Sequence, residues 1–457
     1  MNKAKNIYSE KNYEATYQSL AEFNSSFRVD RRLFRADIEV NIAYCEALFS
    51  AGILTRLETE RIKTGLQAIV KRAEYDKNYF EELPSENIHS FVITRLVQLI
   101  GETGKKLLIG RSETEQTLTT LRLWLRRKIE EISGNAKEFQ RTLIEAAERQ
   151  KEAVLPCFTN LQKAQTVLWA HWCLGYFEIF ARDRERFDEV WRRVNVSPFG
   201  AEASFEIDRE EVAAALQFEG VAMNGFDANS DYDFTIEFVG ACALLMKHLS
   251  RFAAEIIIYS SSKFGFIEFK EAFRSNNVLT NQKSGIETLE LFGGKASRVF
   301  GHQTALLSTT NFSPSNLQEE MKAIFDTVET VESCLKAGNL IVKNLRVNEQ
   351  KAKEAAAKDY QNYSELTDYL LKKDTPFETA RETTGKIFAY AVAKNKEINE
   401  LSLVELQNFS ANIEKDVFQT VSLEQSLANK NQIGGTAPER VFEALETARE
   451  TLEREES

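Results

Sequence analysis

Proline and glycine are scarce in this sequence, with 6 prolines and 20 glycines among 457 residues. Because these residues interrupt helices and mark turns, their scarcity indicates that most of the chain lies in long uninterrupted elements. Hydrophobic residues make up 43% and charged residues 28% of the chain, a composition typical of soluble globular proteins, which excludes a disordered or fibrous class. The length is sufficient for several layers of secondary structure around an extended core.

Cysteine and histidine are also rare, and neither is arranged as a metal site or a disulfide framework. The five cysteines are scattered and show no CxxC spacing, so we expect free thiols in a reducing compartment and hence a cytoplasmic protein. No cluster of histidine, cysteine and carboxylate residues has metal-ligand spacing, and we predict no metal and no cofactor. These residues are Cys45, Cys157, Cys173, Cys242, Cys334, His89, His171, His248 and His302.

The sequence lacks both an excess of basic residues and an apolar run that could span a bilayer. With 58 basic and 69 acidic residues the net charge is −11, which argues against a nucleic-acid or anionic-membrane partner because phosphate groups attract basic surfaces. The most apolar stretch, 234–259, carries four charged side chains, more than a membrane span tolerates. The first 20 residues have no apolar core of signal-peptide length. We expect no nucleic acid and no membrane among the partners.

Apolar residues recur at spacings of three and four along most of the chain, and this periodicity predicts helices. Such patterns run over 166–190, 233–262 and 317–340. An Ala/Lys-rich helical connector is expected at 351–358. Convincing alternating strands are scarce, so the predicted fold class is all-α.

Capping residues mark two of the predicted helix starts. Ser112 and Glu115 form a Ser-x-x-Glu capping box ahead of an apolar stripe. Near the C-terminus, Thr436 is predicted to cap a helix whose first turn contains Pro438. The stripe that follows the first cap consists of Leu118, Leu121, Leu125, Ile129 and Ile132.

These patterns predict a central bundle of very long helices flanked by smaller helical domains at both ends. We expect an N-terminal helical domain over 1–107, the central bundle over 108–350 and a C-terminal helical domain over 351–457.

Ordered blocks of the sequence resemble one family from about residue 20 to residue 452. They include FNSSFRVDRRLFRADIEVNIAYCEAL, SENIHSFVITRLVQLIGETGKKL, LPCFTNLQKAQTVLWAHWCLGYFEIFARDRERF and NGFDANSDYDFTIEFVGACALLMKHLSRFAAEIIIYSS. The chain is similar to argininosuccinate lyase and delta-crystallin, in the fumarase/aspartase superfamily. The resemblance implies three helical domains, a twenty-helix core in a homotetramer, and active sites each built from three chains. It also implies a carbon–nitrogen lyase that eliminates arginine from argininosuccinate to give fumarate, in arginine biosynthesis, without a metal or redox cofactor.

The proton-transfer positions of that family are altered in this sequence. The family segment Thr-His-Leu-Gln stands here as TNLQ, so its histidine is Asn160, which cannot exchange a proton near neutral pH. The carboxylate that orients the histidine is retained as Glu290. In the family's mobile loop the serine proposed as base is replaced by Asn277, whereas the lysine is retained as Lys283. Elimination needs a base for the carbon-bound proton and an acid for the departing nitrogen, so the resemblance leaves the catalytic residues unassigned.

The substrate-binding block is altered as well. The family's His-Thr-Gly-Arg-Ser-Arg-Asn-Asp-Gln stands here as LIGRSETEQ, which places Glu113 where the second arginine contacts substrate. At about 4 Å and an effective dielectric of ~20 such a charge contact is worth roughly 4 kcal/mol, so attraction of a dicarboxylate becomes repulsion. His89 lies in a matching block and either faces the site or has a packing or surface role. The positions expected to bind substrate are Ser26, His89, Glu113, Thr114, Thr159, Gln165 and Gln318.

Three hypotheses follow for function. The chain is an argininosuccinate lyase-like protein that is impaired or inactive in the family reaction, a possible pseudoenzyme. Alternatively, it is a lyase with a rebuilt site for a different N-substituted amino acid, which would take a small amino-acid-like ligand. In the third hypothesis it is an active argininosuccinate lyase that uses substitutes such as Ser275 or Lys322. A mixed oligomer with a competent lyase is a further possible partner arrangement.

Overall fold

A computed structural model describes residues 23–201, 206–270, 287–309, 314–358 and 363–455. The chain divides into two compact units, and each consists of three segments. The first unit contains Met1–Gly134, Asp183–Met246 and Lys295–Glu332, and the second contains Asn135–Arg182, Lys247–Gly294 and Ser333–Ser457.

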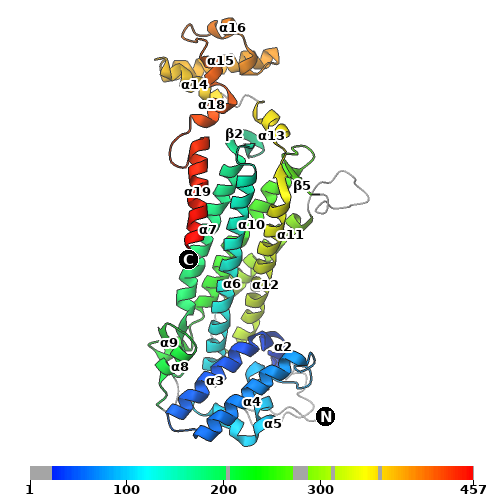
Figure 1. Cartoon of the computed structure of the whole chain (residues 1–457), viewed down its shortest axis with the longest axis vertical. Coiled ribbons are helices and arrows are strands. Elements are labelled where there is room, and N and C mark those ends of the chain that lie inside the picture. The colour runs from blue at the N-terminus through cyan, green and yellow to red at the C-terminus, as the bar shows by residue number, and fades with distance from the viewer. Residues whose placement is uncertain (1–22, 202–205, 271–286, 310–313, 359–362, 456–457) are drawn as a thin grey trace, which may run out of the picture. The chain divides into compact units, whose positions relative to one another are not determined.

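Five long helices, labelled in Figure 1, contribute residues to both units by their sequence ranges. The longest, α6, has 37 residues, and no proline or glycine occurs in it except Gly134. Helices α10 and α12 confirm the patterns predicted at 233–262 and 317–340. The five helices are α6 (Glu113–Arg149), α7 (Trp169–Val194), α10 (Asp233–Ser260), α11 (Glu287–Ser308) and α12 (Pro314–Asn344).

The N-terminal part of the first unit is a group of packed helices (Figure 1). Helix α4 approaches α5 closely at Gly65, where an added Cβ would lie 2.7 Å from Leu96 Cδ1. The serine half of the predicted capping box is confirmed at the N-terminus of α6, since the Glu115 amide donates to Ser112 Oγ at 3.2 Å. The elements are α2 (Phe27–Asp30), η2 (Arg31–Leu33), α3 (Phe34–Ser50), α4 (Arg56–Tyr75), α5 (Ile88–Ile100) and η3 (Gly101–Leu108).

The rest of the first unit packs around the early half of α6. Trp124 of α6 makes an edge-to-face contact with Phe325 of α12, with ring centroids 4.8 Å apart. Arg126 donates to the backbone carbonyls of Leu216 and Gln217, which holds the end of α8. The short elements here are α8 (Arg209–Ala215), α9 (Gly225–Ala228) and a parallel pair, β3 (Val196–Ser197) with β4 (Gly220–Val221).

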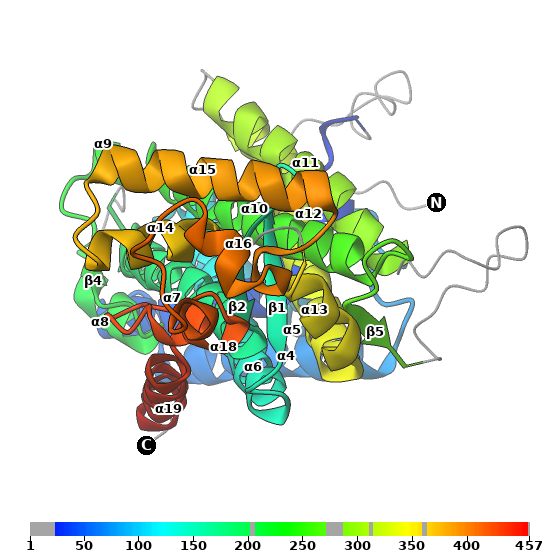
Figure 2. The same cartoon turned by 90° about the horizontal axis from the view of Figure 1, so that it is seen from above.

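The second unit contains two antiparallel strand pairs that the helical pattern did not predict. Strand β1 (Val154–Thr159) pairs with β2 (Gln162–Leu168), so Thr166 belongs to a strand and the helix predicted from that residue begins at Trp169. Strand β5 (Ile267–Phe269) pairs with β6 (Leu345–Val347). Helix α13 (Glu349–Ala356), the predicted connector, packs against β1 (Figure 2).

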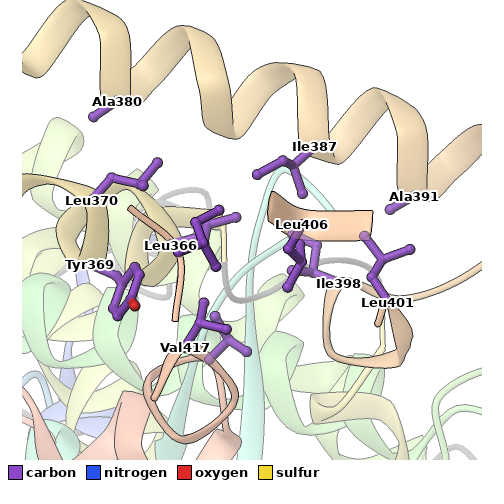
Figure 3. Close-up of a cluster of buried hydrophobic side chains, with 12 residues drawn as sticks. Leu366, Tyr369, Leu370, Ala380, Ile387, Ala391, Ile398, Leu401, Leu406 and Val417 are labelled. Carbon is purple, nitrogen blue, oxygen red and sulfur yellow. The ribbon is translucent and has the colours of Figure 1, made fainter. Parts of the chain in front are cut away.

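The C-terminal part of the second unit has its own apolar core. Buried side chains of α14 (Tyr363–Lys372) and α15 (Phe377–Lys394) meet those of the following short helices, as Figure 3 shows for Leu366, Ile387 and Val417. Such a core allows these elements to pack without strands. The short helices are η5 (Ile398–Glu400), α16 (Leu403–Gln407), α17 (Val417–Thr420) and α18 (Leu423–Ala428).

The last helix, α19 (Pro438–Arg454), starts as predicted at a proline but without the predicted cap. Its N-cap residue is Ala437, and Thr436 Oγ1 is buried with no hydrogen-bond partner among the described residues. The prediction was wrong because Thr436 lies one residue too early, and the fixed φ of Pro438 determines the first turn. Across the described ranges the fold is helical with few, short strands, and no helix there is long and apolar enough to cross a membrane.

Candidate active site

A buried histidine–carboxylate pair lies at the centre of a polar cluster in the first unit. His89 of α5 donates through Nδ1 to Asp37 Oδ1 of α3, and both side chains are almost fully buried. Gln116 Nε2 of α6 donates to the same Asp37 oxygen at 2.6 Å. Burial raises the pKa of Asp37, but the charge and hydrogen bond of His89 outweigh burial, so this pKa lies below its ordinary value.

The imidazole ring has partners on both sides. Burial lowers the pKa of His89, but the negative charge of Asp37 and the hydrogen bond to it outweigh burial, and the pKa lies above its ordinary value. The other ring nitrogen, Nε2, lies 3.0 Å from Oγ1 of the half-buried Thr117 on α6. His89 therefore holds its second proton more tightly than a free imidazole does, and its ring lies between a carboxylate and a hydroxyl group.

A second buried carboxyl group, Asp30, lies at the end of α2. Ser26 Oγ donates to Asp30 Oδ2 at 2.6 Å, and the Ile88 amide donates to Asp30 Oδ1 at 3.1 Å. Burial raises the pKa of Asp30 to about 6, although the hydrogen bond from Ser26 and the charge of His89 oppose this shift. Ser26, which the sequence placed among the binding positions, thus contacts a carboxyl group that titrates near neutral pH.

Glu113 is the first residue of α6, and its carboxylate is half-buried beside Asn87. Asn87 Nδ2 donates to Glu113 Oε1, while Asn87 Oδ1 accepts the Ser90 amide at 2.8 Å and caps α5. Glu113 is close enough to act electrostatically on His89. Thr114 follows it, half-buried in the same helical turn.

Arg111 supplies positive charge to this cluster from the segment before α6. Its Nη1 donates to Gln116 Oε1 at 2.8 Å, and its guanidinium carbon lies 5.5 Å from the centre of the Tyr44 ring. Within the described part of the chain, its Nε and Nη2 atoms are buried and make no hydrogen bond. The cluster therefore combines the cation of Arg111, the hydrogen-bonded His89–Asp37 pair and further carboxyl groups.

A different group of predicted residues lies on the β1–β2 hairpin of the second unit. The turn is formed by Asn160 and Leu161, with φ of 50° and 61°, a left-handed conformation typical of tight hairpin turns. Thr159 pairs with Gln162 at the end of the strands, and all of these side chains are exposed. Gln165 of β2 is also exposed, and its Oε1 accepts from Lys430 Nζ at 3.4 Å.

The remaining predicted positions are only partly described. Glu290 lies in α11 and is exposed. Gln318 lies in α12, but its side chain is outside the described residues. Asn277, Lys283 and Ser275 also lie outside the described residues. Lys322, a proposed substitute, is exposed on α12 and pairs with Glu319 at 2.5 Å.

Sequence reasoning missed several residues of the polar cluster, namely Asp30, Asp37, Asn87 and Thr117. A usable signal was the acidic residue Asp37 among buried apolar neighbours of α3, because a buried carboxylate needs a partner. Chemically, the cluster offers acceptors for a cation and donors for an anion in one place. Among the described residues, no three His, Cys, Asp or Glu side chains are grouped so as to hold a metal ion.

The chain is similar to known proteins over nearly its whole length. A family model described as a lyase matches residues 11–301, and one described as the argininosuccinate lyase C-terminal region matches residues 360–428. The argininosuccinate lyase of Geobacter sulfurreducens is 39% identical over 444 residues, which cover 95% of this chain and 97% of that protein. That of Methylococcus capsulatus is 39% identical over 448 residues, which cover 96% of each.

Solved structures share the fold. EDDS lyase in complex with formate superposes with a TM-score of 0.84 at 21% identity, covering 97% of this chain and 91% of that one. Fumarate lyase from Mesorhizobium sp. BNC1 superposes with a TM-score of 0.73 at 18% identity, covering 92% and 98%. With such identity to curated relatives across the whole length, the chain belongs to the argininosuccinate lyase family of the fumarase/aspartase superfamily.

Proposed function

We propose that this family member is impaired or inactive in eliminating arginine from argininosuccinate. The observation that carries the proposal is the carboxylate of Glu113, which stands where the family resemblance places a substrate-binding arginine. The Glu113 side chain is half-buried and held by Asn87, so a substrate carboxylate that contacts this position meets an anion where the family provides a cation.

The hairpin supports the same proposal. Asn160 occupies the position of the family histidine, and a carboxamide neither accepts nor releases a proton near neutral pH. Loss of one general acid or base typically lowers the rate by about 10²–10⁴. Lys322 is a poor substitute because it is exposed and paired with Glu319.

We expect the family assembly to persist, with 1–107, 108–350 and 351–457 as helical domains of a homotetramer in the cytoplasm. Light scattering after size-exclusion chromatography tests the assembly. Purification of the tagged chain from its own cells tests for a mixed oligomer with a competent lyase.

The decisive experiment compares fumarate release from argininosuccinate by this chain and by the Geobacter sulfurreducens relative under identical conditions. We expect a rate at least about 100-fold lower for this chain. The triple variant Asn160→His, Glu113→Arg, Asn277→Ser should release more fumarate than the unmodified chain, whereas each single variant should gain little, because such groups act as a unit. Release by the unmodified chain at the rate of the relative would contradict the proposal.

A second candidate function, a lyase with a rebuilt site, is favoured by the buried cluster itself. Burying the carboxyl groups of Asp30 and Asp37 is costly, yet both lie in the interior and accept directed hydrogen bonds from Ser26, His89 and Gln116. An elimination assay over a panel of N-substituted aspartates distinguishes the candidates, since only the rebuilt site releases fumarate from another member of the panel.

A further inference from the structure

The hydroxyl group of Thr117 joins the buried His89–Asp37 pair to the half-exposed surface of α6. His89 Nε2 lies 3.0 Å from Thr117 Oγ1, and His89 Nδ1 is already committed to Asp37. Thr117 is half-buried, whereas His89 and Asp37 are inaccessible. Both ring nitrogens of His89 thus have partners, and Thr117 is the partly exposed member of this series of hydrogen bonds.

The direction of the hydrogen bond depends on the charge of His89. As an imidazolium, His89 donates from both nitrogens, so Thr117 Oγ1 accepts and its own proton is free to donate outward. In the neutral ring the remaining proton is on Nδ1 and is donated to Asp37. Nε2 then has a lone pair, which accepts a hydrogen bond from the Thr117 hydroxyl group. Thr117 then presents only lone pairs outward.

Glu113 stands one helical turn before Thr117, so the two side chains share a face of α6. A ligand that contacts both would place a cation against Glu113 and an acceptor against the Thr117 proton. A small zwitterionic amino acid has these two groups.

We propose that Thr117 binds the carboxylate of a small amino-acid ligand whose ammonium group pairs with Glu113, and that the protonation of His89 decides whether Thr117 can donate. In this arrangement His89 is a positioning residue that acts through Thr117. The inference rests on the proposed function because it concerns the same site. It also gives a role to Glu113, which pairs with the ammonium group of the ligand.

The test uses L-ornithine and 1,4-diaminobutane as probes, because they carry the same two ammonium groups and differ in the carboxylate. Calorimetric titration of the full-length protein should give tighter binding of ornithine than of the diamine by about tenfold, the worth of one charge-assisted hydrogen bond. Thr117→Val should reduce this ratio to about one, and Thr117→Ser should restore it. Thr142→Val is the matched control, since Thr142 also lies on α6 and its hydroxyl group bonds only the Glu138 carbonyl at 2.9 Å among the described contacts.

The pH dependence separates this role from a structural one. In the unmodified chain and Thr117→Ser, the ratio should fall as pH rises through the His89 titration, and it should fall less in Thr117→Val. Asp37, Asp30 and Glu113 all act on His89, and their charges also act on the carboxylate that only ornithine carries. That effect is common to all variants, so the role of the hydroxyl group is measured by the difference between the pH profiles of the unmodified chain and Thr117→Val.

A ratio that Thr117→Val leaves unchanged, or failure of the unmodified chain to bind ornithine at millimolar concentration, would overturn the inference. Should Thr117→Val unfold, judged by circular dichroism, Thr117→Ala replaces it as the hydroxyl-free variant. The binding experiment does not depend on turnover, so the two proposals can fail independently. Release of fumarate from argininosuccinate would contradict the proposed function, whereas the ornithine titration alone decides the role of Thr117.

Discussion

The carboxamide of Asn87 joins the start of α5 to the carboxylate of Glu113 on α6. Asn87 Oδ1 accepts a hydrogen bond from the backbone amide of Ser90 at 2.8 Å, and Asn87 Nδ2 donates to Glu113 Oε1. The neutral amide at position 87 thus stabilises the carboxylate of Glu113, whereas a carboxylate at position 87 would repel it.

Replacement of Asn87 with aspartate should separate these two roles. The Asp side chain still caps α5, so the helix is retained, but two carboxylates now face each other near His89. We expect a loss of about 1 kcal/mol in stability and a further rise in the pKa of His89, because the added charge favours the imidazolium. Histidine-selective NMR titration measures the pKa, and the His89 signal is assigned as the one that disappears in the His89→Asn variant.

Asn224→Asp serves as the control for that substitution. Asn224 caps α9 by accepting the Phe226 and Asp227 amides at 2.9 and 3.1 Å. An unchanged His89 titration in Asn87→Asp, or an equal change in Asn224→Asp, would show that a charge at position 87 does not act on His89.

The Asp37–His89 pair should behave as a coupled unit in stability. Asp37→Asn and His89→Asn each leave a buried partner without its counter-charge, so each should lower the free energy of unfolding by about 3 kcal/mol. The double variant should lose clearly less than the sum of the two. Denaturant unfolding measures these values, and Lys322→Gln, which breaks an exposed pair, should cost less than about 1 kcal/mol. Additive losses would contradict coupling.

Asp30 should make the protein less stable as pH rises. Its pKa is raised from 3.8 to about 6, so the folded state binds this proton more tightly than the unfolded state. The contribution is favourable below pH 3.8, is lost as pH rises toward 6, and then stays lost, with a total of about 3 kcal/mol. Asp30→Asn should therefore stabilise the protein relative to the unmodified chain more at pH 7.5 than at pH 4.5. An equal effect at both pH values would show that Asp30 does not titrate between them.

Two glycines in helices should respond oppositely to alanine. Gly65→Ala places a methyl group 2.7 Å from Leu96 Cδ1 and 3.2 Å from Ile100 Cγ2, so these buried side chains must change rotamer or α4 and α5 must move apart, at a cost of about 1–3 kcal/mol. Gly134→Ala adds a methyl group to the interior of α6, where nothing lies within 4 Å, and should stabilise by about 0.5–1 kcal/mol. Thermal denaturation of both variants measures this, and destabilisation by Gly134→Ala would reveal a neighbour at that surface.

The helical architecture was predictable because apolar periodicity persists through elements such as α10 and α12, where few glycines or prolines interrupt it. The β1–β2 hairpin was not predictable in the same way. Its residues continue directly into the apolar pattern of α7, so Thr166 was assigned to the helix although it pairs with Pro156. Short strands next to long helices carry too few residues for a clear alternation.

The polar cluster was partly predictable. Ser26, His89 and Glu113 were named from the resemblance, and the structure brings them together around Asp30 and Asp37. The partners were missed because Asp37, His89 and Gln116 are far apart in sequence and only folding joins them. Thr117 was missed for a simpler reason, since a threonine in a helix carries no distinctive spacing.

The left-handed backbone at Asn160 has a consequence for how this chain diverged. Asparagine and histidine are among the few residues with a Cβ that adopt such a conformation readily. Exchange between the two at this position therefore needs no rebuilding of the hairpin, because either side chain is compatible with this backbone conformation. Substitution of histidine by asparagine at position 160, or the reverse substitution, therefore does not require a misfolded intermediate.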